Sequence, residues 1–385
     1  RGKTFHLQPT VNAMASTGDK RGRPKKEEDV SHGKHKVVKK KKTNQRSSSS
    51  KDNSKSDAKN KATRQASSSV RPFDFNLDDI KPHKEMLKIV SWNVNGIKSL
   101  LHKHSDSLKS YLEREMPDLL CLQETKISFE KRESMQEELE EFYRGVFGEK
   151  EASRYKYYWN CSSTKKGYSG TLLISKIEPI NVDFGDVDSK EGRAVIAEFP
   201  NAFVVNTYVP NSGMKLDRLS YRTEEWDSKM REKLEALNKE KAVIWCGDLN
   251  VAHSDTDVAN WKKKRNKCPG FCDKERENFG LLVGGDGNEI TDLQRTKRTL
   301  PLGRPGAKEG KFVDVWKSLY PEEEGFTFWG YRMNSRGKNN GWRLDYFVIS
   351  KDIVPKVVDC LRRNQLWGPS DHIPLVLLLK KDTLT

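Results

Sequence analysis

The sequence has few of the features that mark membrane proteins, secreted proteins or zinc-binding proteins. No apolar run in it approaches the roughly 18 residues that a membrane-spanning helix needs. Its six cysteines are scattered, and Cys268 and Cys272 have neither a second pair nor a histidine at the spacing of a zinc site. Cys121 and Cys246 lie inside apolar runs, as buried free thiols do. We therefore expect a protein of a reducing compartment that makes no membrane contact.

Residues 1–84 have almost no aliphatic side chains and are rich in lysine and serine. Such a segment cannot bury enough apolar surface to offset the entropy of ordering it, so we predict a disordered tail. Residues 1–86 carry a net charge of +12, which leaves only +4 of the total of +16 for the rest of the chain. A tail this basic indicates a polyanionic partner.

Two short basic segments in the tail suggest what that partner is. Residues 20–26 read KRGRPKK, which resembles an AT-hook and would bind the minor groove of A·T-rich DNA. Residues 39–42 are four lysines, typical of a nuclear import signal or a phosphate-contact patch. A generic solvated basic run remains the alternative for both segments. We expect a nuclear protein, with an organelle as the alternative location.

An ordered catalytic domain is predicted over residues 85–382. Apolar, β-rich runs lie at 87–93, 119–122, 170–175, 193–199, 202–208, 242–246, 345–350 and 373–379. Helical periodicity appears at 105–115 and 217–237. Strands that are paired in tandem and also separated by helices predict an α/β protein with two sheets, each covered on one face by helices.

Residues 282–311 interrupt this pattern, because they are rich in glycine, lysine and arginine and have no period. They predict a long basic loop of the kind that usually carries function. If the loop contacts DNA, its deletion should flatten the salt dependence of binding, whereas an unchanged salt slope would refute the contact.

Polar side chains stand at the edges of six apolar runs. They are Asn93 and Asn95, Gln123 and Glu124, Tyr208 and Asn211, Asp248 and Asn250, Asp345, and Asp371 with His372. One such residue alone is more simply a turn former, but six edges together predict a shared site. Carboxylates that lie a few ångströms apart cannot all stay ionised without a compensating cation. Carboxylate and amide oxygens suit Mg²⁺ or Mn²⁺ rather than zinc, and a metal of this kind activates phosphodiesters.

Seven motifs, in order along the chain, carry a resemblance to a known family. They are KIVSWNVNGI (88–97), PDLLCLQETK (117–126), GYSGTLLIS (167–175), TYVPNSG (207–213), WCGDLNVAH (245–253), FTFWGYRMNSRGKNNGWRLDYFVIS (326–350) and GPSDHIPLVLLL (368–379). They are similar to those of the exonuclease III family of apurinic/apyrimidinic endonucleases. The resemblance implies a four-layered α/β sandwich of the DNase I type. It also implies a monomer that cleaves double-stranded DNA 5′ to an abasic site, with 3′-exonuclease or 3′-phosphodiesterase side activity.

The resemblance also implies the roles of the polar residues. Glu124 would be the principal ligand of Mg²⁺ or Mn²⁺. The other implied metal-site positions are Asn95, Asp371, Asp248, Asn250 and Asn93. Asp248 would activate the attacking water and Asn250 would position it. His372, oriented by Asp345, would bind the scissile phosphate, and the further phosphate positions are Tyr208, Asn211 and Asn93.

Further positions imply contacts with the rest of the substrate. Phe328, Trp342 and Leu344 would form the apolar pocket for a flipped, base-less sugar. Taken alone, Phe328 and Trp342 would be assigned to the core, as we assign Trp92 and Trp245. The implied DNA contacts are Arg332, Arg336 and Met214.

Three positions depart from the animal members of that family. Met214 stands where they place an arginine, and Arg332 stands where they place a methionine, so we expect Arg332 to be the main residue that enters the DNA. Asn95 often corresponds to an aspartate there, and Val90 replaces a cysteine used in redox signalling, so we expect no redox role.

Two other functions remain as alternatives. One is another phosphodiesterase or phosphatase of the same superfamily. The other is a chromatin protein that acts through its basic tail. The motifs LQETK and GWRLDYF favour the abasic endonuclease over the first, and intact Glu124, Asp248 and His372 speak against the second.

Overall fold

A computed structural model describes residues 86–185, 190–284 and 310–385 of the chain. The predicted tail lies outside these residues, as does nearly all of the predicted basic loop. In the described part of the chain no helix is long and apolar enough to cross a membrane.

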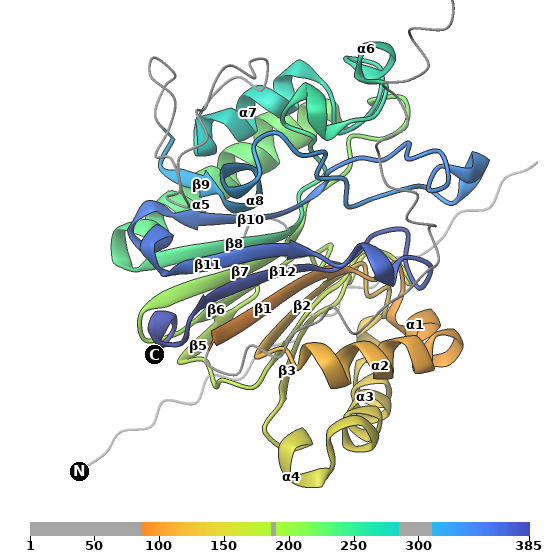
Figure 1. Ribbon diagram of the computed structural model, residues 1–385, viewed down its shortest axis with the longest axis vertical. Coiled ribbons are helices and arrows are strands. Elements are labelled where there is room, and N and C mark those ends of the chain that lie inside the picture. The colour runs from red at the N-terminus through yellow and green to blue at the C-terminus, as the bar shows by residue number, and fades with distance from the viewer. Residues whose placement is uncertain (1–85, 186–189, 285–309) are drawn as a thin grey trace, which may run out of the picture. The chain divides into compact units, whose positions relative to one another are not determined.

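Two sheets of six strands each form the centre of the described domain (Figure 1). The first has the order β11-β12-β1-β2-β4-β3. Its strands are β1 (Met86–Asn93), β2 (Leu119–Gln123), β3 (Lys156–Asn160), β4 (Thr171–Ser175), β11 (Val357–Arg362) and β12 (Leu375–Lys380). The second has the order β5-β6-β7-β8-β10-β9. Its strands are β5 (Asn181–Asp183), β6 (Ala194–Glu198), β7 (Ala202–Tyr208), β8 (Ala242–Asp248), β9 (Phe312–Asp314) and β10 (Asp345–Ser350).

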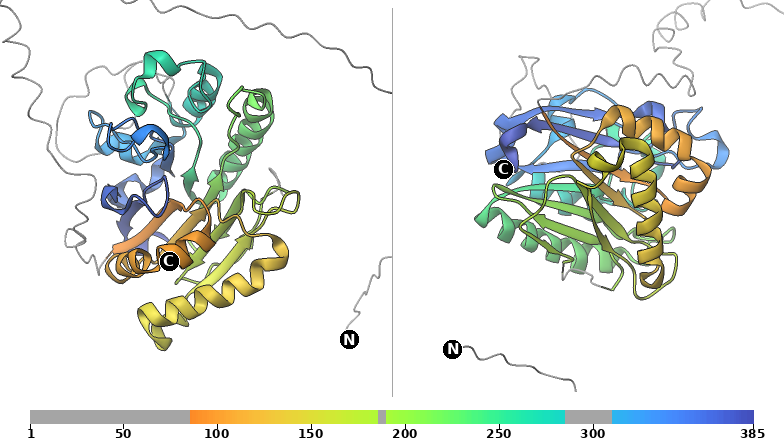
Figure 2. Two further views of the ribbon diagram at one scale, coloured as in Figure 1. Left: turned by 90° about the vertical axis from the view of Figure 1, so that its right-hand side faces the viewer. Right: turned by 90° about the horizontal axis from the view of Figure 1, so that it is seen from below.

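Helices cover the outer face of each sheet. The described α-helices are α1 (Ile97–Lys103), α2 (Ser105–Glu115), α3 (Arg132–Phe147), α4 (Glu149–Ala152), α5 (Asp227–Glu240), α6 (Trp261–Lys264), α7 (Asp273–Val283) and α8 (Val315–Leu319). In Figure 1, α2 and α3 lie below the sheets and α5 and α7 lie above them, and the two further views agree (Figure 2). The four-layered α/β sandwich is therefore confirmed.

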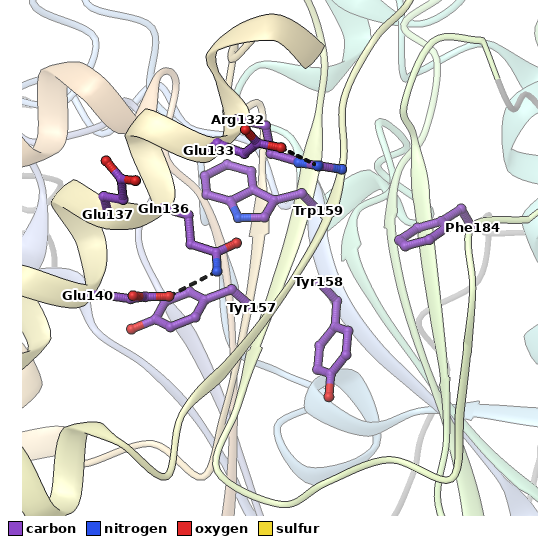
Figure 3. A pocket seen from close by; sticks show the side chains of 9 residues that line it. All are labelled: Arg132, Glu133, Gln136, Glu137, Glu140, Tyr157, Tyr158, Trp159 and Phe184. Carbon is purple, nitrogen blue, oxygen red and sulfur yellow. Dashed lines mark hydrogen bonds and ion pairs between the residues drawn. The ribbon is translucent and has the colours of Figure 1, made fainter.

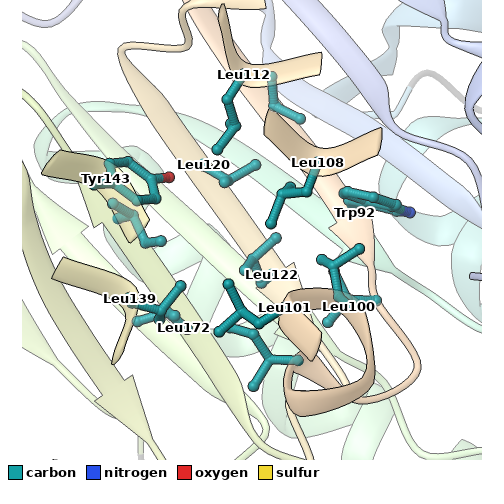
Figure 4. Packing of buried hydrophobic residues seen from close by; sticks show 14 of the residues in the cluster. Trp92, Leu100, Leu101, Leu108, Leu112, Leu120, Leu122, Leu139, Tyr143 and Leu172 are labelled. Carbon is teal, nitrogen blue, oxygen red and sulfur yellow. The ribbon is translucent and has the colours of Figure 1, made fainter. Parts of the chain in front are cut away.

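Three apolar clusters hold these layers together. Between the sheets, strands of both bury their inner faces, with Ile89 and Leu377 from the first and Ile244 and Phe347 from the second. On the outer face of the first sheet, leucines of α1, α2 and α3 pack on those of β2 and β4 (Figure 4). A third cluster joins α5 and α7 to the second sheet. Burial of apolar surface on both faces explains why β2, β8 and β12 read as nearly continuous apolar runs rather than alternating ones.

The two sheets share one pairing pattern. In the first, β1 runs parallel to β2 and antiparallel to β12; in the second, β8 runs parallel to β7 and antiparallel to β10. Outside these pairs, β4 and β3 continue the first sheet as β6 and β5 continue the second, all antiparallel. Carboxyl ends of the parallel strands and amino ends of β10 and β12 therefore meet at one end of the sandwich.

The predicted helix over residues 217–237 is shifted and irregular in the structure. A π-helical turn, Tyr221–Trp226, precedes α5, which runs on to Glu240. The π turn directs the guanidinium of Arg222 inward, where it donates to the carbonyls of Pro210 and Leu249 at 2.9 Å each. These bonds fix the loops that follow β7 and β8, so the irregularity serves the end of the sandwich where the strand edges meet.

Candidate active site

The polar strand edges converge, as predicted, through the register of both sheets. Asn93 and Gln123 are paired at the ends of β1 and β2. Tyr208 and Asp345 are both paired with Asp248, from β7 and β10 on either side of β8. Each sheet therefore contributes one half of a single cluster.

A histidine–carboxylate pair forms the buried centre of this cluster. His372 Nδ1 lies 2.8 Å from Asp345 Oδ2, and both residues are less than 5% exposed. The Nε2 atom of His372 lies 3.8 Å from Asp248 Oδ2. Asp345 thus fixes the orientation of the imidazole, while Nε2 lies close to the carboxylate of Asp248.

Asn93 joins the two sheets at the cluster. Its amide nitrogen donates to Glu124 Oε1 at 3.0 Å and to Asp248 Oδ2 at 2.9 Å. Because Glu124 follows β2 and Asp248 ends β8, this one side chain ties a carboxylate of each sheet to the other. Such an arrangement holds the distance between the two carboxylates fixed.

A lysine stands between the residues predicted to bind a metal. Lys126 Nζ lies 2.8 Å from Glu124 Oε2 and also donates to Asn95 Oδ1. The amide nitrogen of Asn95 donates to Asp371 Oδ1 at 3.0 Å. Glu124, Asn95 and Asp371 are therefore brought together, and a cationic group fits among their oxygens.

Asn250 is held beside Asp248 by the turn that follows β8. Its backbone N–H donates to Asp248 Oδ1 at 3.0 Å, and its side chain bonds Val209 O at 2.8 Å. Asn211 donates to Asn250 Oδ1 at 2.9 Å. Asn250, Glu124 and Asn95 all adopt positive φ angles of 48° to 51°, which non-glycine residues rarely adopt. Backbone strain of this kind concentrates at functional sites.

The charges of the cluster shift one another's proton affinities. Burial, with the carboxylates of Asp345 and Glu124, raises the pKa of Asp248 to about 7 against the opposing charge of His372. Burial alone would lower the pKa of His372, but Asp345 and Asp248 outweigh it and raise the pKa to about 10. Desolvation, together with the carboxylates of Glu124 and Asp248, raises the pKa of Tyr208 well above its ordinary value. The cluster therefore combines a cationic imidazole with a carboxylate that can exchange a proton near neutral pH.

An apolar wall of side chains adjoins the imidazole. The Phe328 ring centroid lies 4.8 Å from that of His372, and Phe328 forms a β-bridge to Trp342. Both aromatic residues pack on a small cluster that includes Leu344 and Phe271. The structure brings the three predicted pocket residues together, with Phe328 and Trp342 half-buried rather than fully in the core. Trp92 and Trp245 are core residues as predicted, with exposed fractions of 0% and 4%.

Comparison with known proteins identifies the family of this chain. The profile described as Endonuclease/Exonuclease/phosphatase family matches residues 90–372. The chain belongs to this family. It is 39% identical over 298 residues to the zebrafish (Danio rerio) protein named DNA repair nuclease APEX1, covering 76% of this chain and 82% of the relative. It is 37% identical to an exodeoxyribonuclease of Bacillus subtilis, covering 76% of this chain and 99% of the relative.

Solved structures of the family agree with the fold. The AP endonuclease of Leishmania major has a TM-score of 0.61 and 29% identity, over 79% of this chain and 90% of that one. An AP endonuclease of Archaeoglobus fulgidus has a TM-score of 0.58 and 28% identity, over 76% and 99% of the two chains.

The three predicted DNA contacts lie in different surroundings. Met214 is 84% exposed, and Arg332 is exposed beside Met333, which is 83% exposed. Arg336 instead lies 3.7 Å from the centroid of the Trp329 ring and donates to Asn364 O at 2.8 Å. Burial and the charge of Arg362 lower the pKa of Arg336 to about 10. The first two side chains are free to enter DNA, whereas Arg336 is packed against the protein, and its predicted contact stays a prediction.

Several residues that support the site carry no signal strong enough to assign them a role from the sequence. Lys126 stands in the LQETK motif but was given no role, and Ser370 bonds Asn93 O at 2.7 Å, tying the SDH segment to β1. Beneath the site, Gln123 donates to Asn206 Oδ1 at 2.8 Å across the two sheets. The motif spacing signalled Lys126 and Ser370, but nothing in the sequence pairs Gln123 with Asn206.

Among the described residues, one carboxylate–histidine group could hold a metal ion: Asp248, Asp345 and His372, whose ligand atoms lie within 4.8 Å of one another. Since Asp345 already occupies Nδ1 of His372, this trio offers few free oxygens. Glu124 and Asn95, where an ammonium already sits, suit a hard cation better.

A separate hollow of about 400 Å³ lies between α3 and the edge strand β3 (Figure 3). It is lined by Arg132, Glu133, Gln136, Glu137, Glu140, Tyr157, Tyr158, Trp159 and Phe184. It contains no residue of the carboxylate–histidine cluster, and several of its polar groups pair with one another, as Gln136 does with Glu140. The hollow therefore takes no part in the chemistry considered below.

Proposed function

We propose that the protein is an AP endonuclease that hydrolyses the phosphodiester 5′ to an abasic site in duplex DNA. One observation carries the proposal: a His372–Asp345–Asp248 cluster lies directly beside an apolar wall that begins at Phe328. Phosphodiester chemistry and a place for a base-less sugar thus adjoin. The relatives named as AP endonuclease and DNA repair nuclease support the same conclusion.

His372 is the group that would neutralise the scissile phosphate. With its raised pKa it is an imidazolium at neutral pH, and Asp345 keeps Nδ1–H engaged so that Nε2–H points at the substrate. A donor fixed in this way stabilises the negative charge that grows on phosphoryl oxygens as water attacks. Tyr208, paired with Asp248 across the sheet, flanks the same space and would add a further donor, while both N–H groups of Asn93 hold the carboxylates of Glu124 and Asp248 in place.

Asp248 would take the proton of the attacking water. Its pKa near 7 lets it exchange that proton at neutral pH, and Asn93 holds its Oδ2 by a hydrogen bond. Asn250 is fixed next to it by the bond from its own N–H, so its side chain would help place the water.

The residues present fit a divalent cation. Lys126 shows that the oxygens of Glu124 and Asn95 accept positive charge, and Asp371 lies beside Asn95. Although burial favours its neutral form, the Lys126 charge and the Asn93 bond keep the pKa of Glu124 below its usual range, as a ligand requires. A bound Mg²⁺ would polarise the phosphate and stabilise the leaving 3′-oxygen.

The apolar wall would select the lesion. Phe328, Trp342 and Leu344 offer ring faces and a branched side chain but few polar partners, which suits a deoxyribose without a base. An abasic nucleotide loses no stacking when it leaves the helix, so extruding it costs less than extruding a normal nucleotide.

The deciding experiment is magnesium-dependent nicking of a duplex with one abasic site. We expect a 3′-hydroxyl product, no product with EDTA, and none with an undamaged duplex. Hydrolysis of an inositol phosphate in place of abasic DNA would favour the alternative of a different phosphohydrolase of the family. DNA binding without any hydrolysis would favour a chromatin protein.

We further propose a monomer located in the nucleus. The basic composition of the tail and its lysine run at 39–42 support the location, and the resemblance to the exonuclease III family supports the monomer. Imaging of the full chain with this run intact or replaced by alanine tests the location, and sedimentation tests the monomer.

A further inference from the structure

One lysine near the apolar wall differs from its neighbours. Residues 261–265 read WKKKR, and Lys262 and Lys263 are exposed, whereas Lys264 is half-buried. Its Nζ lies 4.5 Å from the Trp342 ring centroid and 3.1 Å from Asn340 Oδ1. The amine is therefore held against the wall by a ring face and an amide rather than dispersed in solvent.

The wall links this amine to the reactive centre. Trp342 is bridged to Phe328, and Phe328 in turn is bridged to His372. The Lys264 amine thus contacts Trp342, the His372 imidazole contacts Phe328, and the two aromatic residues pack on the same small cluster. A sugar lying against these residues with its phosphate at His372 would extend toward Trp342 and bring C1′ near the amine.

The surroundings of Lys264 also favour a reactive amine. None of the ion pairs found among the described residues includes it. Burial lowers the pKa of the ammonium below its ordinary value. A desolvated lysine without a carboxylate partner is in the state from which amines attack carbonyl carbons.

We propose that Lys264 forms a reversible imine with the C1′ aldehyde of the abasic deoxyribose. This rests on the proposed function, because it requires that the apolar wall bind an abasic sugar. The ring-opened sugar presents an aldehyde, and the amine lone pair forms the N–C1′ bond. The carbonyl oxygen leaves as water together with both amine hydrogens, which gives the imine. No bond to phosphorus or to C3′ breaks, so the step is separate from strand cleavage.

The imine would distinguish a natural abasic site from an intact nucleotide or a cyclic analogue by the presence of an aldehyde rather than by shape. A nucleotide with its base has C1′ committed to the glycosidic bond and cannot react. An amine at the wall would therefore hold a genuine abasic site longer than a cyclic analogue of the same shape, which lacks the aldehyde.

Borohydride trapping tests the proposal. The full chain carrying Asp248→Ala, to prevent incision, is mixed in EDTA with a duplex that holds one natural abasic site. Sodium borohydride then reduces any imine to a stable amine. Proteolysis and mass spectrometry locate the modified lysine among the many of this chain, including those of the tail. We expect modification at Lys264, its loss with Lys264→Arg, and no change with the matched control Lys263→Arg.

Other outcomes would overturn the proposal. Adducts confined to other lysines, or a yield unaffected by Lys264→Arg when its thermal midpoint matches the parent, would exclude the imine. A tetrahydrofuran analogue should give no adduct. Magnesium-dependent nicking of that analogue by the unmodified protein tests the proposed function separately. Nicking without trapping rejects the imine alone, whereas absence of nicking rejects the function on which it rests.

Discussion

Asp248 lies where three charges compete for one proton. It is almost fully buried, close to Asp345 and Glu124, and 3.8 Å from the imidazole of His372. Replacing it by asparagine keeps the shape and one acceptor oxygen, which can still accept from Asn93, but removes the base. We expect Asp248→Asn to lower the single-turnover nicking rate by about 10²–10⁴-fold, with unchanged affinity for abasic DNA by gel shift. Retained nicking would contradict the role of Asp248.

The pH dependence of nicking depends on two groups, one of which must be deprotonated and the other protonated. Asp248 must be ionised, so the rate should rise as pH rises through about 7, where its raised pKa lies. His372 must be protonated, so the rate should fall as pH rises through about 10. Asp345→Asn removes the main cause of the raised His372 pKa and should move the alkaline limb to lower pH. Nicking rates between pH 5.5 and 10.5 check both limbs, and an unmoved alkaline limb would exclude His372 as its source.

Arg332 and Met214 differ in what they can offer DNA. Both are exposed, but only the arginine can bond phosphates and base edges. We expect Arg332→Ala to weaken binding of an abasic duplex more than Met214→Ala does, measured by fluorescence anisotropy. The opposite order would show that the methionine is the main inserted side chain.

At the scale of elements, Gly247 fixes how closely β7 and β8 approach below the site. Its φ is 136°, and a Cβ there would lie 1.8 Å from Thr207 O. We expect Gly247→Ala to reduce the free energy of unfolding by on the order of 2 kcal/mol or more, since alanine at positive φ is strained. It should also displace Asp248 and reduce nicking.

Gly145 in α3 provides the matched control for urea denaturation. A Cβ there meets nothing within 4 Å, and the residue lies within a helix. Gly145→Ala should therefore stabilise the protein by up to about 1 kcal/mol. Equal effects of the two substitutions would mean that the close approach at Gly247 is not needed.

The elements that the sequence predicted well are those with a strong local signal. Strands such as β8 and β12 are buried on both faces, so their apolar runs have clear ends. Helix α3 went unpredicted because its fully buried stripe is a single residue per turn, Met135, Leu139 and Tyr143, among many charges. The strand-end residues of the site were predictable because polar side chains stand at the edges of six apolar runs, where each run has a clear boundary. Contacts such as Lys126 with Asn95 depend on loop conformations at positive φ, which no periodicity encodes.

At the scale of the whole molecule, a buried ion pair joins the loop after β8 to the start of β10. Arg343 bonds both oxygens of Asp257 at 2.9 and 2.8 Å and also pairs with Asp314. Burial would raise the pKa of Asp257, but Arg343 outweighs it and lowers the pKa to about 2. A carboxyl whose folded pKa is lowered stabilises the fold above its unfolded value, and this stability is lost as pH falls from about 4 to about 2.

Asp257→Asn should therefore destabilise the protein at neutral pH, by on the order of 3 kcal/mol, because it leaves Arg343 partly unpaired. The difference in the free energy of unfolding between Asp257→Asn and the unmodified protein should become smaller as pH falls below about 4. Urea denaturation at several pH values measures it, with Asp106→Asn on the exposed face of α2 as the control. A difference in unfolding free energy that stays constant down to pH 2.5 would contradict the lowered pKa of Asp257.

The shared pairing pattern of the two sheets has a consequence for the cell. Glu124 and Asn93 come from one sheet, and Asp248 and Asp345 come from the other. Neither half holds a complete set of reacting groups, so strand cleavage begins only after the halves have docked. A chain that is still emerging from the ribosome, or one that has partly unfolded, would carry a basic surface but could not cut the genome. Folding of the complete sandwich therefore has to precede any nuclease activity.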